Sequence, residues 1–149
     1  MFFDDLTQFL KQAQSLSEKE AWLFAMDRDA KEEIIRLNTE DQLFDEGIDS
    51  MDRTLGAYSE VTKAIKRSKG QRTDHVTLKD TGEFYDSFKV IVDSKGFDII
   101  ADDTAFYDVP LTQTWGNDII GLTKENIGFM AEWLKPGYVE YVFKKLHGV

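Results

Sequence analysis

The fold is decided by the stretch FKVIVDSKGFDIIA, which covers residues 88–101. Hydrophobic side chains occupy every second position through 88–92 and again through 97–101, which is the alternation of a strand with one buried face. Between the two runs, Ser94-Lys95-Gly96 supplies the small, flexible residues that a tight turn needs. The stretch therefore predicts a β-hairpin with its turn at 94–96.

The segment just before the hairpin carries a second, shorter strand signal. Val76-Thr77-Leu78 alternates like a strand, and Thr81-Gly82 then interrupts the pattern. Because glycine takes positive φ at little cost, we expect Gly82 to adopt such a conformation and to set how the chain enters the hairpin. The sequence thus predicts an antiparallel sheet with the hairpin at its centre.

Amphipathic helices are expected on the N-terminal side, over residues 1–46. Hydrophobic residues recur at helical spacing from residue 2 to residue 10, and Ser17 with Glu20 forms a capping box that begins a second helix. Thr39 with Gln42 repeats that pattern, so the second helix either breaks at Asn38 or continues to about residue 44. Its expected core-facing positions are Leu23, Met26, Ala30, Ile34 and Leu37, and its expected C-cap is Gly47.

A short basic helix is expected after an irregular connection over residues 47–59. Ser59 is its N-cap, the helix runs from Glu60 to about Lys69, and Gly70 closes it. The apolar positions of this helix are Val61, Ala64 and Ile65. Together with the sheet, it makes up the third part of the chain, residues 60–122.

The C-terminal part, residues 123–149, is again helical. Residues 102–121 predict a loop that packs aromatic side chains, with at most one short helix. Thr123 caps the next helix, and Pro136-Gly137 is expected to stop it before a last short helix begins at Tyr138. Helices, a hairpin-bearing sheet and then helices indicate an α+β fold, and a length of 149 residues suits one domain.

Composition excludes several classes of site and of location. The chain has no cysteine, so disulfides, a thiolate nucleophile and a cysteine-based zinc site are excluded. Its acidic N-terminus lacks the features of a signal peptide, and no run of about 18 apolar residues predicts a membrane span. We therefore expect a protein made and kept in a cytoplasm, or in a particle assembled there.

The sequence carries no catalytic signature. Its two histidines, His75 and His147, stand in polar or terminal contexts and are expected at the surface. The acidic loop 45–52 fails the spacing of a calcium-binding EF-hand, and the glycines fit no phosphate-binding loop. We expect no catalytic residue, no metal, no cofactor and no small-molecule substrate.

The basic segment is the candidate for a surface that faces a partner. Residues 53–79 carry seven Lys or Arg and two Asp or Glu, a net charge of +5 inside a chain of net charge −10. Like charges one helical turn apart repel, so such a helix favours an anion nearby: acidic residues of the same chain, an acidic subunit, or nucleic acid. An acidic protein with one nearby aromatic residue argues against nucleic acid. The candidate interface residues are Arg53, Lys63, Lys66, Arg67, Lys69 and Arg72.

A resemblance to a known family rests on the same region. The stretches concerned are 58–66, 69–71 and 76–88, which ends in a Leu-x-x-Thr-Gly-x-Phe-x-x-Ser pattern, together with Gly-Leu-Thr at 121–123. This region resembles small structural proteins of tailed bacteriophages of Bacteroides-type hosts, including the crAss-like phages. It is similar, more distantly, to the tail-completion or virion-morphogenesis group. The resemblance covers about residues 43–125, and residues 106–115 depart from it.

The resemblance implies a non-enzymatic virion protein, a neck (head-to-tail connector) or tail-completion subunit that assembles as a ring between portal and tail. Its partners would be copies of itself and portal, neck or tail proteins, with packaged DNA close by. It would be located in the virion and, during assembly, in the host cytoplasm. The alternatives are a small acidic regulatory or inhibitory binding protein and an unrecognised hydrolase.

Overall fold

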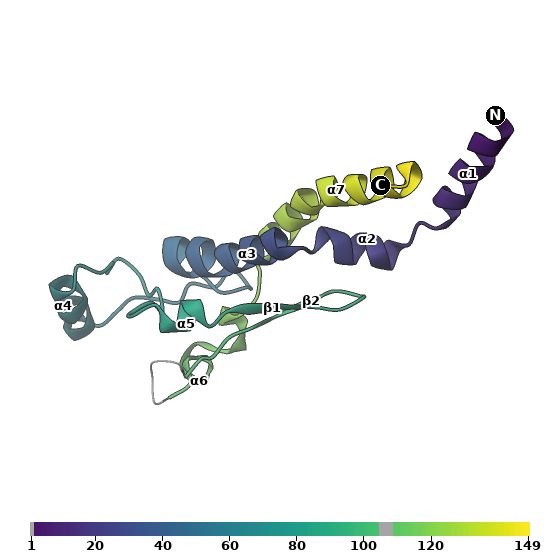
Figure 1. Ribbon diagram of the computed structural model, residues 1–149. Helices are drawn as coiled ribbons and strands as arrows, with labels where there is room; N and C mark the ends of the chain where they lie inside the picture. The colour runs from purple at the N-terminus through teal and green to yellow at the C-terminus, as the bar shows by residue number, and fades with distance from the viewer. Residues whose placement is uncertain (1, 105–108) are drawn as a thin grey trace.

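In the computed structural model, which describes residues 2–104 and 109–149, helices flank a two-stranded antiparallel sheet on both sides along the chain (Figure 1). The fold is α+β, as the sequence predicts. Helix α1 projects at one end of the elongated molecule, and α4 projects at the other (Figure 1). The elements are α1 (Phe2–Gln14), α2 (Glu18–Ala25), α3 (Arg28–Arg36), the π-helix η1 (Leu37–Glu46), α4 (Glu60–Ser68), α5 (Glu83–Asp86), β1 (Lys89–Val92), β2 (Phe97–Ile100), α6 (Leu111–Trp115), the 3-10 helix η2 (Asn117–Ile119) and α7 (Lys124–His147).

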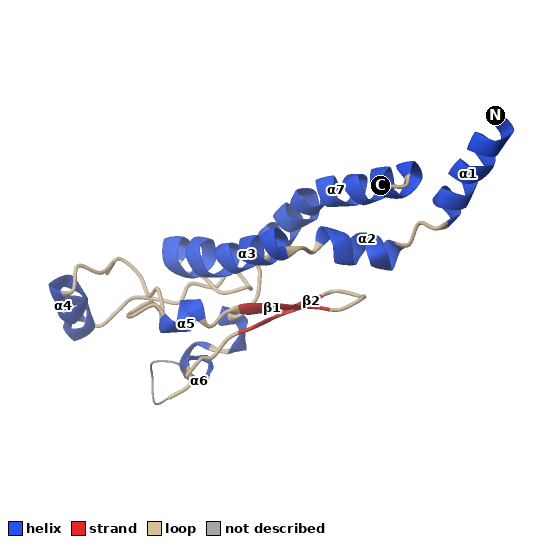
Figure 2. Ribbon diagram, in the orientation of Figure 1, coloured by secondary structure: helices blue, strands red, loops and turns tan. Residues whose placement is uncertain are grey.

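The hairpin confirms the central prediction from the sequence (Figure 2). Strands β1 and β2 pair antiparallel, with Val90 opposite Ile99 and Val92 opposite Phe97. The Asp93 carboxylate accepts hydrogen bonds from the backbone N–H groups of residues 95 and 96, at 2.7 and 2.9 Å, and so fixes the turn. One face of the hairpin is therefore free to pack against the helices.

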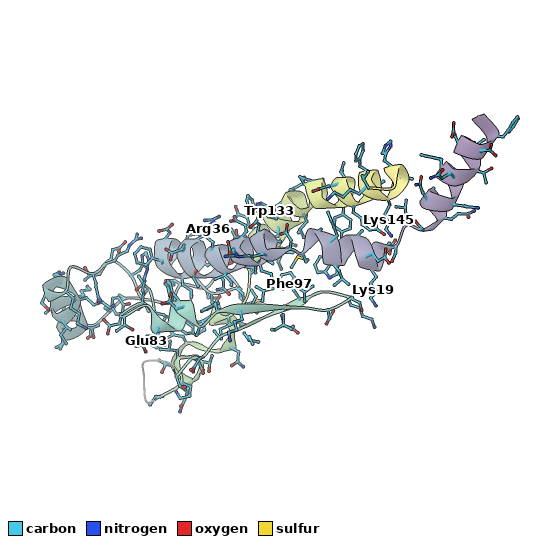
Figure 3. All side chains as sticks on the ribbon, viewed as in Figure 1. Lys19, Arg36, Glu83, Phe97, Trp133 and Lys145 are labelled. Carbon is cyan, nitrogen blue, oxygen red and sulfur yellow. The ribbon has the colours of Figure 1, made fainter. Side chains whose placement is uncertain are left out.

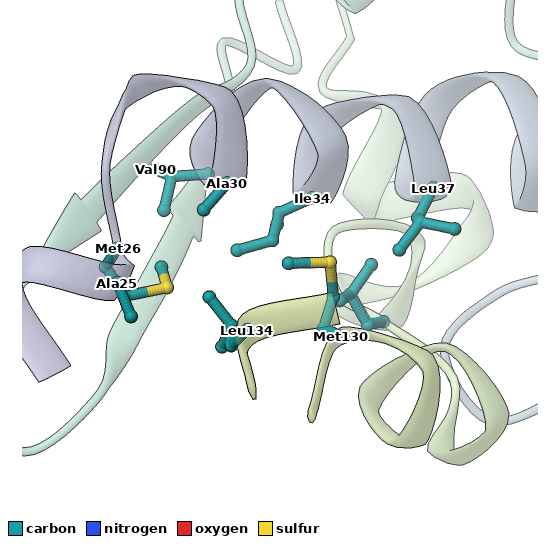
Figure 4. Packing of buried hydrophobic residues seen from close by; sticks show 9 residues of the cluster. Ala25, Met26, Ala30, Ile34, Leu37, Val90, Met130 and Leu134 are labelled. Carbon is teal, nitrogen blue, oxygen red and sulfur yellow. The ribbon is translucent and has the colours of Figure 1, made fainter. Parts of the chain in front are cut away.

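The main core lies between that face and the helices α2, α3 and α7 (Figure 4). Val90 of β1 packs in it, and Phe97 and Ile99 of β2 pack against it, as the alternation requires. A second cluster lies around η1, α5 and residues 76–88, and Ile35 and Ile99 pack against both clusters. The buried residues of the main core are Ala25, Met26, Ala30, Ile34, Leu37, Val90, Leu122, Met130 and Leu134.

The second predicted helix is interrupted near Asp27 and not at Asn38, the position that the sequence offered for a break. Ser17 caps α2 as predicted, since its side chain accepts a hydrogen bond from the Glu20 N–H. The helix then ends before Asp27, whose carboxylate caps α3 by accepting from the Ala30 N–H at 2.9 Å. At Asn38 there is no break, because α3 continues directly into η1. The Thr39 hydroxyl does not cap; it donates to the Ile35 carbonyl one turn back, at 2.7 Å.

Two buried amide side chains tie η1 to the segment that leads into α7. The Asn38 side chain donates to the Ile119 carbonyl at 3.0 Å and accepts from the Gly121 N–H at 2.7 Å. The Gln42 side chain donates to the Gly121 carbonyl at 2.8 Å and accepts from the Thr123 N–H at 2.9 Å. Both side chains have no exposed surface. They satisfy backbone groups that have no sheet or helix partner, which buried backbone requires.

The predicted strand at residues 76–78 does not form. Leu78 has a φ of +56°, a left-handed conformation that no strand contains. Its neighbours make single contacts instead of a ladder: the Val76 N–H donates to the Gly56 carbonyl at 3.0 Å, and the Thr77 N–H donates to the Tyr58 hydroxyl at 2.9 Å. Among the described residues the sheet therefore consists of the hairpin alone.

Helix α7 does not stop at Pro136, contrary to the prediction from the sequence. It runs without interruption from the Thr123 cap to His147, with the proline inside it. Proline removes one helical hydrogen bond, but α7 packs along α2, and Tyr141 of α7 donates to the Glu20 carboxylate at 2.8 Å. This packing holds both halves of α7 in one helix.

The aromatic loop predicted over residues 102–121 contains two short helices, α6 and η2, where at most one was expected. Leu111 and Ile119 are buried in the second cluster, and Trp115 packs against it. The part of the predicted loop at residues 105–108, with the aromatic residues Phe106 and Tyr107, lies outside the described residues.

Gly82 takes the left-handed conformation that the sequence predicts, with a φ of +92° directly before α5. A Cβ there would approach only the Asp86 carboxylate, at 3.9 Å, so the expected cost is backbone strain without a clash. We expect Gly82→Val to lower the free energy of unfolding by about 1–3 kcal/mol. The control is Gly96→Val, at a hairpin position with open space around it. Urea unfolding curves that coincide for the two variants would refute this account of Gly82.

Candidate functional site

Helix α4 carries the basic segment and is formed by local signals. The Ser59 hydroxyl caps it by accepting from the Thr62 N–H at 3.2 Å, and Gly70 follows it with a φ of +70°. Figure 1 shows α4 held between two long connections, away from the other helices. What fixes α4 to the rest of the chain is therefore a small number of side chains.

Lys66 is the side chain that anchors α4. Its ammonium group donates to the Lys79 carbonyl at 2.8 Å and to the Gln71 side-chain oxygen at 3.3 Å, and it lies 4.8 Å from the centre of the Tyr58 ring. Lys66 is only 7% exposed. A lysine this buried needs such acceptors, so this residue serves the fold of its own chain.

Most of the other candidate interface residues are also paired within the chain. Arg53 bonds the buried carboxylate of Asp49 at 2.9 Å and the exposed carboxylate of Asp118 at 2.6 Å. Lys69 pairs with Asp80 at 3.0 Å, and Lys63 pairs with Glu60, one turn away, at 3.0 Å.

Arg72 closes the same network towards the end of η1. It forms two hydrogen bonds to the Asp74 carboxylate and lies 3.6 Å from the Asp45 carboxylate. These bonds hold the pKa of Asp74 well below its usual value, at about 2. Acidic residues of the same chain thus neutralise most of the basic segment. They are one of the three anionic partners that the sequence left open.

Arg67 is the exception. It is exposed, and among residues 2–104 and 109–149 no carboxylate forms an ion pair with it. Of the six candidates, Arg67 is thus the cation that remains available to a partner.

These contacts correct the prediction that Lys66, like Arg67, is an interface residue. Lys66→Glu places a carboxylate against the Lys79 carbonyl and beside Asp80, so we expect the free energy of unfolding to fall by about 2–4 kcal/mol. Arg67→Glu is the matched control and should stay within about 0.5 kcal/mol of wild type. Equal urea midpoints for the two variants would show that Lys66 does not anchor the helix.

The apolar side of α4 faces outward. Val61 is 72% exposed and Ile65 is 52% exposed, and Ala64 between them is exposed as well. We refer to these three residues as the α4 stripe. Hydrophobic spacing predicted an amphipathic helix but not its orientation, and the structure buries the lysine in place of the apolar residues. A helix that turns apolar side chains to solvent is typical of a surface covered by a partner.

A second surface feature lies beside α7, and we refer to it as the acidic groove. It encloses about 450 Å³ where the end of α2 meets the middle of α7. Trp133, which Figure 3 labels on α7, lines the groove, together with Ala25 and Gly137. The carboxylate-bearing residues that line it are Asp27, Glu132 and Glu140. No motif in the sequence indicates this groove, because it joins residues more than 100 positions apart.

Both histidines that the sequence raised as catalytic candidates contact other residues of the same chain. His75 is not a surface residue: its side chain is 17% exposed, and its Nε2 lies 2.6 Å from the Phe44 carbonyl oxygen. His147 packs against the ring of Phe143. In the loop 45–52, Asp49 bonds Arg53, and burial raises the pKa of Glu46, with further increases from neighbouring carboxylates. Among the described residues, no group of three His, Asp or Glu side chains has the arrangement of a metal site.

The described helices include none with both the length and the apolar character needed to cross a bilayer. Comparison with known proteins adds no relative: no family model, no curated protein and no solved structure matches the chain. Among the described residues, the surface features that bear on function are the α4 stripe, Arg67 and the acidic groove.

Proposed function

We propose that this protein is a non-enzymatic structural subunit of a tailed-phage virion, a neck or tail-completion protein that assembles as a ring between portal and tail. The observation that carries the proposal is the orientation of α4, which buries Lys66 and exposes Val61 and Ile65. Apolar side chains that a helix exposes are typical of an interaction surface, and a subunit covers such a surface on assembly. The resemblance of residues 58–88 to phage structural proteins supports the same reading.

The distribution of apolar surface also supports an assembly role. At the end opposite α4, Phe3 of α1 is 76% exposed, and Val139 and Phe143 of α7 are exposed as well. A subunit in a ring contacts neighbours through at least two different surfaces. Exposed apolar side chains at both ends of an elongated chain fit that requirement.

Deletion of the gene from the phage tests the proposed function. A neck or tail-completion subunit joins two structures that assemble separately, so we expect filled heads and free tails to accumulate and infectious particles to be lost. Expression of the wild-type chain in trans should restore joined particles. Normal virions in the deletion strain, viewed by electron microscopy, would overturn the proposal.

A further inference from the structure

The α4 stripe and the acidic groove lie on different parts of one chain. Figure 1 shows α4 at one end of the molecule and the α2–α7 pair towards the other. When one surface binds a different surface on an identical neighbour, the contact is heterologous and propagates into a ring or a filament. A contact of this kind leaves every copy with both surfaces occupied.

The two surfaces match in their chemistry. The α4 stripe is apolar. At about 100° per residue, Arg67 lies about 60° beyond Ala64 at one edge of the stripe, and the buried Lys66 lies about 100° beyond Ile65 at the other edge. The acidic groove has an apolar floor formed by Ala25, Trp133 and Gly137. Its carboxylate-bearing residues are Asp27, Glu132 and Glu140. An apolar stripe with a cation at its edge thus complements an apolar groove with anions at its rim.

We propose that α4 of one copy binds in the acidic groove of a second copy, with Val61 and Ile65 on the groove floor and Arg67 against the rim carboxylates. This inference rests on the proposed function and adds to it the contact through which neighbouring subunits bind each other. Charge complementarity indicates that α4 of a second copy fills the groove. Arg67 is the exposed cation of the basic segment that lacks an ion pair among the described residues, and three residues that line the groove carry carboxylates.

The ion pairs already present at the rim do not oppose this contact. Glu132 pairs with Lys135 at 2.8 Å, and Glu140 pairs with Lys144 at 3.1 Å. Both pairs are solvent-exposed pairs within one helix, which contribute little to stability and exchange readily. Arg67 can therefore join them, and its charge sets the orientation of the helix more than the strength of binding. The stripe is short, so a single contact is weak, and closure of a ring makes it cooperative.

Variants of the full-length chain test the contact by sedimentation velocity over a concentration series. The stripe variant Val61→Glu/Ile65→Glu and the rim variant Glu132→Arg/Glu140→Arg should each weaken self-association at least ~10-fold. The control Ile91→Glu changes a side chain of β1 that is 52% exposed but does not line the groove, and it should associate like wild type. Circular dichroism establishes that each variant is folded.

A mixing experiment tests the heterologous geometry. The stripe variant keeps an intact groove, and the rim variant keeps an intact α4. An equimolar mixture should therefore form a 1:1 dimer at the highest concentrations of the series, where one contact without ring closure is populated, although neither variant associates alone there. A mixture that stays monomeric, or a wild-type chain that stays monomeric at every concentration, would overturn the inference.

This result is independent of the test of the proposed function. If the chain joins heads to tails but is monomeric in solution, the inference fails and the proposed function stands. If the chain associates through α4 but the deletion strain makes normal virions, the inference stands and the proposed function fails.

Discussion

Replacement of Gln42 by methionine is expected to lower the free energy of unfolding by about 3–5 kcal/mol, the largest effect of any single substitution considered. Methionine has nearly the same shape but cannot hydrogen-bond the groups that Gln42 binds. The Gly121 carbonyl and the Thr123 N–H would then lose their partner inside the protein, and so would the Asn126 side chain, which donates to Gln42 at 2.8 Å. Each buried group left unsatisfied costs about 1–3 kcal/mol.

The control for this variant is Gln14→Met, on the exposed surface of α1, which should change stability by less than about 0.5 kcal/mol. Urea unfolding followed by circular dichroism measures both. If Gln42→Met unfolds at the wild-type midpoint, the buried amides do not hold the segment before α7, and our account of that junction is wrong.

Two glycines of α7 are expected to respond to alanine with opposite signs. At Gly137 a Cβ would lie 3.0 Å from Ala25 Cα and 3.1 Å from Ala25 Cβ, so α2 and α7 approach closely only because the glycine has no side chain. Since backbone atoms cannot move aside as a side chain does, we expect Gly137→Ala to destabilise the protein by about 1–3 kcal/mol.

Gly128 is the matched control in the same helix. A Cβ there meets open space, so Gly128→Ala should stabilise the protein by about 0.5–1 kcal/mol, because alanine loses less entropy than glycine in a helix. Thermal unfolding of the two variants gives the comparison directly. A Gly137→Ala variant as stable as Gly128→Ala would contradict the close approach of α2 to α7.

The features that the sequence predicted correctly are those set by nearby residues. The hairpin follows from alternation around a turn, and the caps at Ser17, Ser59 and Thr123 follow from hydroxyl side chains within three residues of the N–H groups they bind. The positive φ of Gly82 belongs to the same class. Each of these features is determined by residues close in sequence, and tertiary packing does not change it.

The predictions that were wrong depended on contacts with distant residues. Pro136 reads as a helix end, but packing against α2 keeps α7 continuous. Gln42 reads as part of a capping box, but its side chain binds a loop about 80 residues away. The break at Asp27 was missed because the apolar spacing continues across it, although an aspartate before a helix is itself a capping signal.

The candidate site was predicted in part. The charge pattern located the basic segment but could not show which of its cations are paired, since their partners include Asp118, 65 residues from Arg53. The same spacing that predicted α4 gave Val61 and Ile65 as apolar positions without showing that they face solvent. Both facts depend on where α4 lies relative to the rest of the chain, which periodicity does not encode.

Our central proposal, that the chain is a virion subunit, is tested most directly by quantitative mass spectrometry of gradient-purified particles of a tailed phage whose genome carries this sequence. We predict that the chain is present at a constant copy number relative to the portal protein, and that this ratio survives washing at high salt, because apolar contacts are not screened by ions. A chain that is abundant in the infected-cell lysate but absent from purified particles would contradict the claim.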